Sequence, residues 1–454
     1  MHTKSSAQID FTHGSILGRT AWFALPICAG NILQQMYSTV DTLVIGNYCD
    51  AAALAAVATS SQPLEILLCV FLGIGSGISI LVSQMTGTRD RERLQSLVRT
   101  SVFFLYAAAL PLTVIGILLG PQLLQVMNVP ADAMPYAVQY LRITTIGILG
   151  NMGYNFNAGI LRGLGNSTSS ILLLGISCTT NIILDLVLVA GLNMGISGVA
   201  WATAASMFLA WGFSIPYIRH FCPDLKFPVF PHGFDPCILR RMVRIGFPLG
   251  LNTALYSVGH LFMQTILNGQ GAVFVAGCSV AGKVSGIANI AVTSYSSAAT
   301  VFAGQNIGAG NYLRLRKGAW QIPLFSGVIT LVGGLIVTAC CHPLLALFTS
   351  DAAVLDHAQR YIHIVLPFTW AYAVFNGIMC FISGIGEIRY PTVVNILLLW
   401  VVRIPAAYLL AWFGYGNYAM VSIPLSFVTG MVAMLLYFRT HHWRSLCARS
   451  KSQE

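Results

Sequence analysis

The chain has 454 residues, of which 56% are hydrophobic and only 8% are charged. Its mean hydropathy of +0.74 is too high for a soluble fold of this length. These values exclude a soluble enzyme or a soluble binding domain and indicate a membrane protein. The formal net charge of +10 therefore reflects how basic residues are distributed around a bilayer.

The apolar residues fall into twelve stretches, each long enough to cross a bilayer as a helix of about 20 residues. Because these runs are continuous and do not alternate with polar residues, a transmembrane β-barrel is excluded. The sequence predicts an all-α membrane protein with twelve transmembrane helices. In chain order, the predicted spans are 18–46, 52–82, 95–118, 137–160, 168–190, 194–219, 240–268, 274–302, 318–340, 358–383, 390–412 and 418–438.

The basic residues indicate the orientation of the chain. Of the 24 Lys and Arg residues, 20 fall in termini, loops and helix ends on the side that holds the amino terminus. The positive-inside rule then places both termini in the cytoplasm. Because the basic residues are dispersed over many short loops, they indicate contact with membrane lipids and disfavour a nucleic-acid partner. Residues 1–14 lack the apolar core of a cleaved signal peptide, and we expect a bacterial plasma (inner) membrane.

An internal repeat divides the chain into two halves. An offset of 221 residues pairs Gln84 with Gln305, and near the start of each half an offset of 222 pairs Pro26 with Pro248. Each half supplies six spans, so the halves are parallel repeats of a kind found in transporters. We predict two pseudo-symmetric six-helix bundles, namely an amino-terminal lobe at 15–219 and a carboxy-terminal lobe at 237–440, joined by a proline-rich cytoplasmic linker at 220–236.

Two carboxylates, Asp41 and Asp185, lie in the middle of apolar spans. A charged side chain at bilayer depth costs about 2.5 to 3.5 kcal/mol on insertion scales, so each must face a protein interior or a wet cavity. The repeat aligns Asp41 with Phe262 or Met263, and Asp185 with Ala406. The second half therefore builds the same architecture without these acids, and we expect them to serve function in the amino-terminal lobe.

The neighbours of the two acids favour a cation or proton site. Asn181 lies four residues before Asp185 on the same helical face, and Thr203 could add a hydroxyl oxygen from the next helix. An all-oxygen set of this kind suits Na⁺, and it suits a protonated carboxyl network equally well.

Polar residues also share the face of Asp41 on the first span. Gln34, Tyr37 and Ser38 precede it by seven, four and three residues. Pro26 stands fifteen residues before Asp41 in the same helix and predicts a kink, whose angle could change as Asp41 gains or loses a proton.

These motifs resemble those of the multidrug and toxic compound extrusion (MATE) family over residues 15 to 440. The resemblance is carried by the first-span pattern from Pro26 to Gly46, the RGLG turn at 162–165, and the Asn181-x-x-x-Asp185 pair followed by GISGVAWAT at 195–203. The set of Asp41, Asn181, Asp185 and Thr203 is similar to the amino-lobe acidic site of the DinF-like branch. The acid that NorM-like members carry in the tenth span is missing here, which disfavours a second cation site.

The resemblance implies a V-shaped pair of six-helix bundles that exports cationic or amphipathic organic compounds in exchange for H⁺ or Na⁺. It implies no cofactor, a coupling role for Asp41, Asn181, Asp185 and Thr203, and a possible Na⁺ at these four residues. We also expect a monomer.

Further polar and aromatic residues are candidates for a substrate cavity. We expect Asn157 to line it on family grounds, and the other candidates are Gln34, Tyr37, Glu65, Met263 and Tyr256. Lys283 and Arg403 are intramembrane cations that we expect to pair with carbonyl groups, neighbouring helices or Glu65 and not to touch substrate.

Motifs for soluble catalysis are absent from the sequence. There is no Walker A, GxSxG or HExxH motif and no loop long enough for an ATPase domain, so an ion gradient must supply the energy. The glycine-rich string GIGSGISI at 73–80 indicates close helix packing and not a phosphate loop. The alternative functions are a flippase for lipid-linked oligosaccharides or peptidoglycan precursors, whose cavity should be rich in Arg and Lys, and a channel, which would lack obligatory exchange.

Overall fold

The computed structural model describes residues 8–48, 51–126, 129, 133–231, 233–349 and 351–440. Within these ranges, the side chains of residues 38, 42–43, 46–47, 51–67, 126 and 224 are outside the description. Two candidates from the sequence, Ser38 and Glu65, therefore lie outside the described side chains. Every secondary-structure element of the described chain is a helix, which confirms the all-α fold class.

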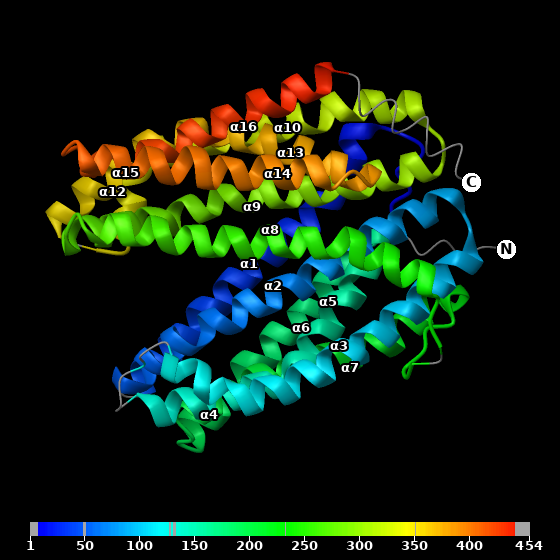
Figure 1. The fold of residues 1–454 in the computed structure, drawn as a ribbon, viewed down its shortest axis with the longest axis horizontal. Helices are drawn as coiled ribbons and strands as arrows, with labels where there is room; N and C mark the ends of the chain where they lie inside the picture. The colour runs from blue at the N-terminus through cyan, green and yellow to red at the C-terminus, as the bar shows by residue number, and fades with distance from the viewer. Residues whose placement is uncertain are drawn as a thin grey trace. The chain divides into compact units, whose positions relative to one another are not determined.

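The first half contains six membrane-length helical segments (Figure 1). Two of them consist of consecutive helices, and one of these ends in a π-helical turn, η1. The elements are α1 (Ile16–Tyr48), α2 (Ala51–Thr88), α3 (Arg91–Val126), α4 (Met134–Ile146) with α5 (Ile148–Gly163), α6 (Ser167–Asp185) with η1 (Leu186–Gly191), and α7 (Ile196–Phe221).

The second half repeats this order after a short 3₁₀ turn, η2 (Pro223–Leu225), in the linker. Its fifth segment again contains a π-helical stretch, η4. The elements are α8 (Pro236–Asn268), α9 (Ala272–Gly308), α10 (Tyr312–Ala339) with the short α11 (Cys341–Ala346), α12 (Ala352–Val365) with η3 (Leu366–Phe368) and α13 (Thr369–Ile385), α14 (Arg389–Leu397) with η4 (Leu398–Arg403) and α15 (Ile404–Trp412), and η5 (Gly416–Val421) with α16 (Ser422–Arg439).

Each predicted span corresponds to one of these segments, and the twelve-helix fold is confirmed. Ten segments of the described chain are long and apolar enough to cross a membrane, the exceptions being α4–α5 and α8. The span predicted at 137–160 is divided at Gly147, where a Cβ would lie only 3.0 Å from the Cβ of Ala204 on α7. The span predicted at 358–383 is interrupted by the 3₁₀ turn around Pro367, which has no N–H to donate.

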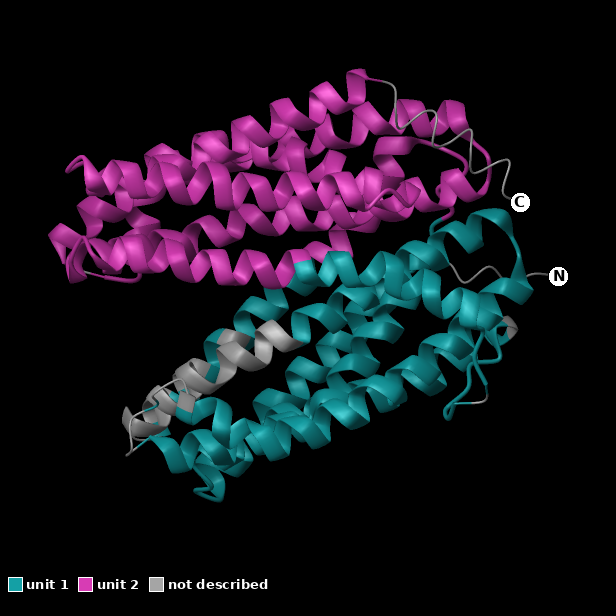
Figure 2. Ribbon diagram, viewed as in Figure 1, with its two compact units in different colours: residues 1–9, 29–251 teal, residues 10–28, 252–454 magenta. Residues whose placement is uncertain are grey.

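The chain packs into two units (Figure 2). Unit 1 comprises Met1–Ile9 and Ala29–Leu251, and unit 2 comprises Asp10–Cys28 and Asn252–Glu454. The predicted lobes follow the sequence repeat, whereas these units follow the packing of the chain. Both boundaries between the units fall within a helix. The chain changes unit two residues after Pro26 in α1 and three residues after Pro248 in α8.

In unit 1, the first part of α8 packs closely against α2 through two pairs of glycines spaced four residues apart. A Cβ on Gly73 would lie 2.1 Å from the backbone nitrogen of Gly250, and a Cβ on Gly77 would lie 2.9 Å from the Cα of Gly246. Small residues at this spacing let helix backbones approach one another in membranes. The prediction that the glycine-rich string at 73–80 serves helix packing is confirmed.

In unit 2, the segment before α1 is anchored around Phe11, whose side chain is completely buried. The Phe11 N–H donates to Gln305 Oε1 at 2.8 Å, and Arg314 Nε donates to the Phe11 carbonyl at 2.8 Å. The Phe11 ring meets the rings of Phe23 and Phe302 edge-on. These contacts explain why residues 10–28 belong to unit 2 although the rest of α1 belongs to unit 1.

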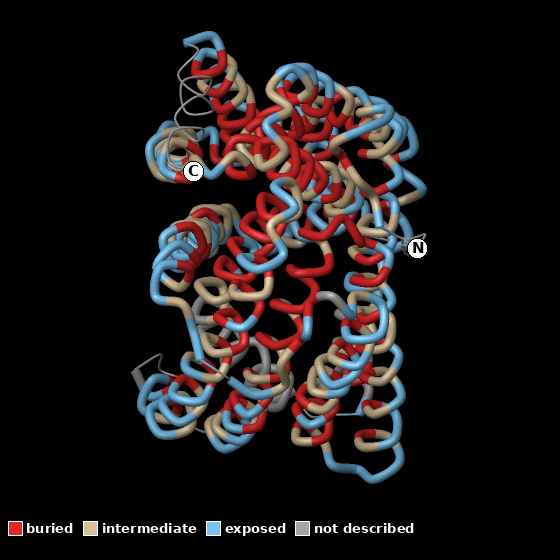
Figure 3. The backbone as a smooth tube through the Cα atoms, turned by 90° about the vertical axis from the view of Figure 1, so that its right-hand side faces the viewer, coloured by how far each residue is buried: buried red, intermediate tan, exposed pale blue. Residues whose placement is uncertain are grey.

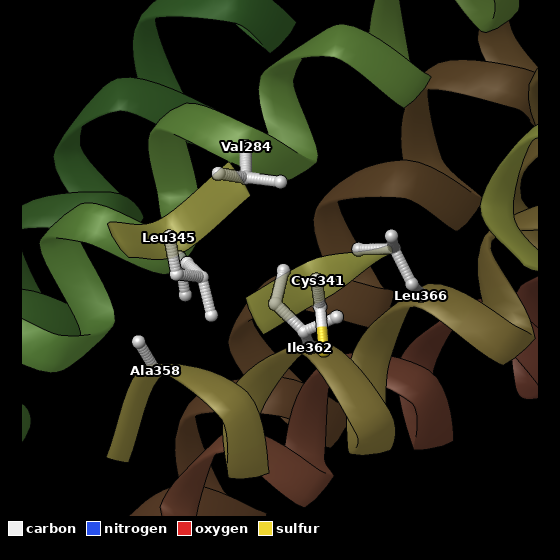
Figure 4. Close-up of a cluster of buried hydrophobic side chains, with 7 residues drawn as sticks. Val284, Cys341, Leu345, Ala358, Ile362 and Leu366 are labelled. Atoms are coloured by element: carbon white, nitrogen blue, oxygen red, sulfur yellow. The ribbon is translucent and has the colours of Figure 1, made fainter. Parts of the chain in front are cut away.

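The fourth segment of each half forms the buried centre of its unit. In unit 1, α5 packs against α2, α3 and α7, and in unit 2, α13 packs against α9, α10 and α16. Figure 3 shows buried positions along the helices of both units, and Figure 4 shows one apolar cluster of unit 2, formed by α9, α11, α12 and η3. Large apolar side chains such as Leu118, Val328 and Leu436 are more than half exposed, as expected for helices that face lipid.

Candidate functional site

The two intramembrane acids of unit 1 meet each other. Asp41 lies on α1 and Asp185 is the last residue of α6, and their carboxyl groups are hydrogen-bonded. Asp185 is completely buried, whereas Asp41 is partly buried. Among the described residues, no Lys, Arg or His forms a salt bridge with either acid. The pair is therefore not neutralised by a basic side chain of the described structure.

Asn181 joins the two acids. We orient its side-chain amide so that the nitrogen faces the carboxyl groups, because only this orientation satisfies both ends of the amide. The nitrogen then donates to Asp41 Oδ1 at 3.1 Å and to Asp185 Oδ2 at 3.0 Å, and the oxygen accepts the backbone N–H of Thr203 at 3.3 Å. Asn181 is completely buried, so the amide is a fixed part of the site.

Tyr37 completes the described cluster. Its hydroxyl is hydrogen-bonded to Asp41, one helical turn further along α1, and to the side chain of Thr203 on α7. Thr203 therefore contacts the site through its N–H to Asn181 and its hydroxyl to Tyr37. Tyr37, which the sequence makes a candidate for the substrate cavity, is thus joined to the acids with which it shares a helix face.

One oxygen of the pair has no partner. Asp185 Oδ1 is buried and accepts no hydrogen bond from a described residue. Leaving a buried acceptor unsatisfied is costly, and the cost is higher when the group carries charge. An unpaired carboxylate oxygen at the centre of a buried polar cluster is a place where a proton or a cation can bind.

An apolar cluster is formed by α1, η1 and α7, from residues near the acids in the sequence. Val44 and Ile45 of α1 pack with Val189 of η1 and Val199 of α7, and Val40 packs against this group. Asp185 stands where α6 gives way to the π-helical η1, and π-helical turns are frequent at functional sites.

Among the described side chains, the other cavity candidates form no hydrogen bond with either acid. In unit 1, Gln34 is exposed on α1, and Asn157 is buried and donates to Ser214 Oγ at 2.6 Å, which links α5 to α7. In unit 2, Met263 is buried against Ala407 and Ala419. The side chain of Glu65 is outside the described residues.

The intramembrane cations of unit 2 have partners that the sequence did not indicate. Arg403 donates to the hydroxyls of Tyr256 and Ser426, each at 2.9 Å. Lys283 is exposed and lies 5.7 Å from the ring centroid of Phe348. The described partners of Arg403 are hydroxyls and rings of the neighbouring helices α8 and α16.

Known proteins share this organisation. A model of the MatE family matches residues 26–187 and 248–409. The chain belongs to the MatE family. The second match begins and ends 222 residues after the first, which agrees with the internal repeat. As a MatE protein, the chain is a multi-pass membrane transporter and not an enzyme.

Relatives of this MatE protein cover nearly its whole length. It is 29% identical over 442 residues to the probable multidrug resistance protein YpnP of Bacillus subtilis, covering 96% of this chain and 98% of that protein. It is 29% identical over 428 residues to the probable multidrug resistance protein YoeA of the same organism, covering 89% and 91% of the two chains. A solved structure of a multidrug resistance MATE family transporter in an outward-facing conformation superposes with a TM-score of 0.89 at 20% identity, covering 98% and 99% of the two chains.

Proposed function

We propose that this MatE protein exports cationic or amphipathic organic compounds in exchange for H⁺ or Na⁺ by alternating access. Its relatives along nearly the full chain are named multidrug resistance proteins, which supports an efflux function. The hydrogen-bonded pair of Asp41 and Asp185 carries the ion-exchange part of the proposal. We further propose that it acts as a monomer in a bacterial inner membrane with both termini in the cytoplasm, and that it belongs to the DinF-like branch.

The orientation of the donors favours H⁺ over Na⁺ as the coupling ion. A hydrogen bond between two carboxyl groups requires a proton on one of them. The Asn181 oxygen faces the Thr203 N–H, and the Thr203 hydroxyl faces Tyr37, so neither oxygen is directed to the carboxyl pair. Because Na⁺ takes oxygen ligands, its binding at all four residues would require the Asn181 amide to turn.

Coupling follows if the ion and the substrate compete for the same negative charge. Protonation of Asp41 and then of Asp185 on the outside neutralises the pair, so an organic cation loses its attraction and leaves. Deprotonation on the inside restores the charge. A change in the bend of α1 at Pro26 would redirect the segment that carries Asp41, which links protonation to the conformation of that helix.

The experiment that tests the proposal is efflux of ethidium from liposomes that contain the purified protein. The H⁺ gradient, the Na⁺ gradient and the membrane potential are imposed independently. We expect an H⁺ gradient alone to drive efflux and a Na⁺ gradient alone to have no effect. If both carboxyl groups exchange protons for one monovalent cation, one net charge moves per cycle and a potential of 100 mV contributes about 2.3 kcal/mol.

Two outcomes would contradict the proposal, and a third would change its coupling ion. Downhill leakage of ethidium that needs no coupling ion would indicate a channel. Transport confined to lipid-linked anions would indicate a flippase. Efflux driven by Na⁺ alone would keep the exchange but replace the proton by Na⁺ as the coupling ion.

The Tyr37 hydroxyl gives a milder test of the same site. Tyr37→Phe keeps the ring but removes the hydrogen bond to Asp41 and the link to Thr203. We expect H⁺-driven ethidium efflux to slow by about tenfold, the size of one hydrogen bond to a charged group. Tyr48→Phe is the matched control, because Tyr48 lies on the same helix and is largely exposed. Equal efflux rates in the two variants would remove Tyr37 from the coupling site.

A further inference from the structure

The linker that precedes α8 lies along α3 of its own unit. The Tyr106 hydroxyl on α3 donates to the carbonyl of Val229 at 3.2 Å, and the Tyr106 ring lies 6.4 Å from that of Phe230. One turn earlier on α3, the ring of Phe103 stacks on that of Phe234 with centroids 4.3 Å apart. Residues 229–234 are therefore packed against the side of α3.

These contacts fall on the part of α3 that is suited to cross the bilayer. Arg99 is the last charged residue of α3, and the remainder, residues 100–126, is about 40 Å long at about 1.5 Å per residue. This length matches a bilayer of about 40 to 45 Å with its headgroups, of which about 30 Å is hydrocarbon. Thr100 then lies at headgroup level. Phe103 and Tyr106, about 5 and 9 Å further along, lie at the edge of the hydrocarbon.

The linker exposes two phenylalanines at this depth. Residues 227–234 contain no Asp, Glu, Lys or Arg and include three phenylalanines. Phe227 is buried, and its carbonyl accepts from Arg219 Nε on α7 at 2.9 Å. Phe230 and Phe234, in contrast, are 63% and 47% exposed. Aromatic side chains at the boundary between headgroups and hydrocarbon anchor proteins in membranes, so these two rings are suited to contact lipid chains.

Two arginines of α8 stand at the headgroup level. The hydroxyl of Ser101, next to Thr100, meets the sulfur of Met242 at 3.8 Å, so α8 passes α3 at this level. Arg240 and Arg244 lie two residues before and two residues after Met242, one helical turn apart, and both are exposed. Neither forms a salt bridge with a described residue. The guanidinium groups are therefore available to an anionic group from outside the protein.

The charge of this region suits an anionic partner. Residues 219–244 contain five Lys and Arg and only two Asp. One of these acids, Asp235, accepts the N–H groups of Cys237 and Ile238 at 2.8 and 3.3 Å and so serves as the amino-terminal cap of α8. Anionic lipids strengthen the membrane binding of a protein by about fivefold for each Lys or Arg near the surface. Basic groups at headgroup level with aromatic rings slightly deeper are the arrangement of an interfacial lipid anchor.

We propose that the linker surface, formed by Phe230, Phe234, Arg240 and Arg244, binds an anionic phospholipid of the adjacent leaflet. The two rings contact its acyl chains, and the two guanidinium groups bind its phosphate, for which the planar fork of Arg is suited. A soluble protein is the less suitable occupant, because the surface lies beside the membrane-crossing part of α3. This inference goes beyond the proposed export function and does not depend on it.

Phe230→Trp tests where the linker lies. The full-length variant is placed in phosphatidylcholine nanodiscs, and its tryptophan emission in excess of the natural protein is measured with two quenchers, lipid chains brominated near the headgroup and iodide in the water. We expect quenching by the brominated chains and protection from iodide. Glu92→Trp is the matched control. Glu92 is exposed on the first turn of α3, about 12 Å before Thr100, so its replacement should be quenched by iodide alone.

The same reporter measures the lipid preference. Brominated phosphatidylglycerol and brominated phosphatidylcholine are compared at equal mole fractions in phosphatidylcholine nanodiscs, and the quenching of Phe230→Trp gives the ratio of their association constants. We expect phosphatidylglycerol to be favoured. Arg240→Gln combined with Arg244→Gln should lower the ratio by about five- to 25-fold, which is about fivefold for each Arg that contacts the lipid. Arg360→Gln removes an exposed Arg of α12 in unit 2 and should leave the ratio unchanged.

Two results would overturn the proposal. Quenching of Phe230→Trp by iodide and not by brominated chains would place the linker in water, where its exposed rings could serve a soluble protein instead. Equal association constants for the two lipids would show that the surface does not select an anionic headgroup. Thermal unfolding in the same nanodiscs shows whether each variant is folded. Because quenching requires no transport, failure of the export function would leave these measurements unaffected.

Discussion

We expect Asp185→Asn to abolish H⁺-driven ethidium efflux, to the level of liposomes without protein, while the protein stays folded. Asn has the shape of Asp but can neither carry the negative charge nor bind and release the proton. Its amide can still hydrogen-bond to Asp41 and Asn181, which limits the structural cost. Efflux from liposomes under an imposed pH gradient measures the loss, and thermal unfolding of the purified variant shows whether it is folded.

The same variant should change how cation binding depends on pH. In the natural protein, acidification protonates the pair, removes its negative charge and weakens the binding of ethidium. In Asp185→Asn, a neutral amide replaces one of the two carboxyl groups, so ethidium should bind more weakly and with a shallower dependence on pH. Fluorescence titration of ethidium at a series of pH values gives both quantities.

Asp356→Asn is the matched control for the change of Asp185. Asp356 is about half exposed on α12 and pairs with Arg360 at 2.7 Å. The substitution therefore removes only an exposed salt bridge, which is worth at most about 1 kcal/mol. Its efflux should equal that of the natural protein. Wild-type efflux in Asp185→Asn, with the same pH dependence of binding, would show that Asp185 does not couple ion and substrate.

The cluster of Asp41, Asn181 and Asp185, which we propose as the coupling site, could be predicted because its signals are local in the sequence. Asn181 and Asp185 are one helical turn apart, and Tyr37 and Asp41 are one turn apart, so each pair shares a helix face. The apolar context of both acids and their absence from the second half pointed to function. The sequence could not show that the Tyr37 hydroxyl is shared between Asp41 and Thr203, since that depends on how α1 packs against α7.

The contacts of Arg403 and the division into units could not be predicted for the same reason. Tyr256 lies 147 residues from Arg403, and its hydroxyl meets the guanidinium only after the helices have packed. The repeat located two halves in chain order, but not the packing of residues 10–28 and 252–454 into one unit. Pro26 and Pro248 were visible as a repeated pair, and their position next to the change of unit emerged only from the contacts of α1 and α8.

The glycine contact between α2 and α8 predicts the largest effect on stability. A Cβ on Gly73 would lie 2.1 Å from the nitrogen and 2.2 Å from the Cα of Gly250, and 2.7 Å from the carbonyl oxygen of Gly246. All three are backbone atoms, which cannot move aside as a side chain can. Gly73→Ala must therefore push the two helices apart, and we expect it to destabilise the protein by about 3 kcal/mol, the upper end of the usual range for overpacking.

Gly175→Ala separates this steric effect from the general effect of replacing glycine in a helix. Gly175 lies inside α6 of the same unit, and a Cβ there would meet nothing within 4 Å. Ala favours a helix over Gly by about 1 kcal/mol, so this control should be neutral or more stable than the natural protein. Thermal unfolding in nanodiscs, followed by tryptophan fluorescence, compares the two variants under the same conditions.

Both substitutions add one methyl group to a helix of unit 1. If their effects on stability have opposite signs, the difference is due to the atoms that surround the added methyl group. Pro248 lies between Gly246 and Gly250, in the part of α8 that α2 holds, and the chain enters unit 2 directly afterwards. Loss of the glycine contact should therefore lower the unfolding temperature and also loosen the packing of this part of α8 against α2. The second effect should appear as faster hydrogen exchange at residues 240–251. If Gly73→Ala unfolds at the same temperature as Gly175→Ala, the close approach of α2 and α8 is not what holds that segment in unit 1.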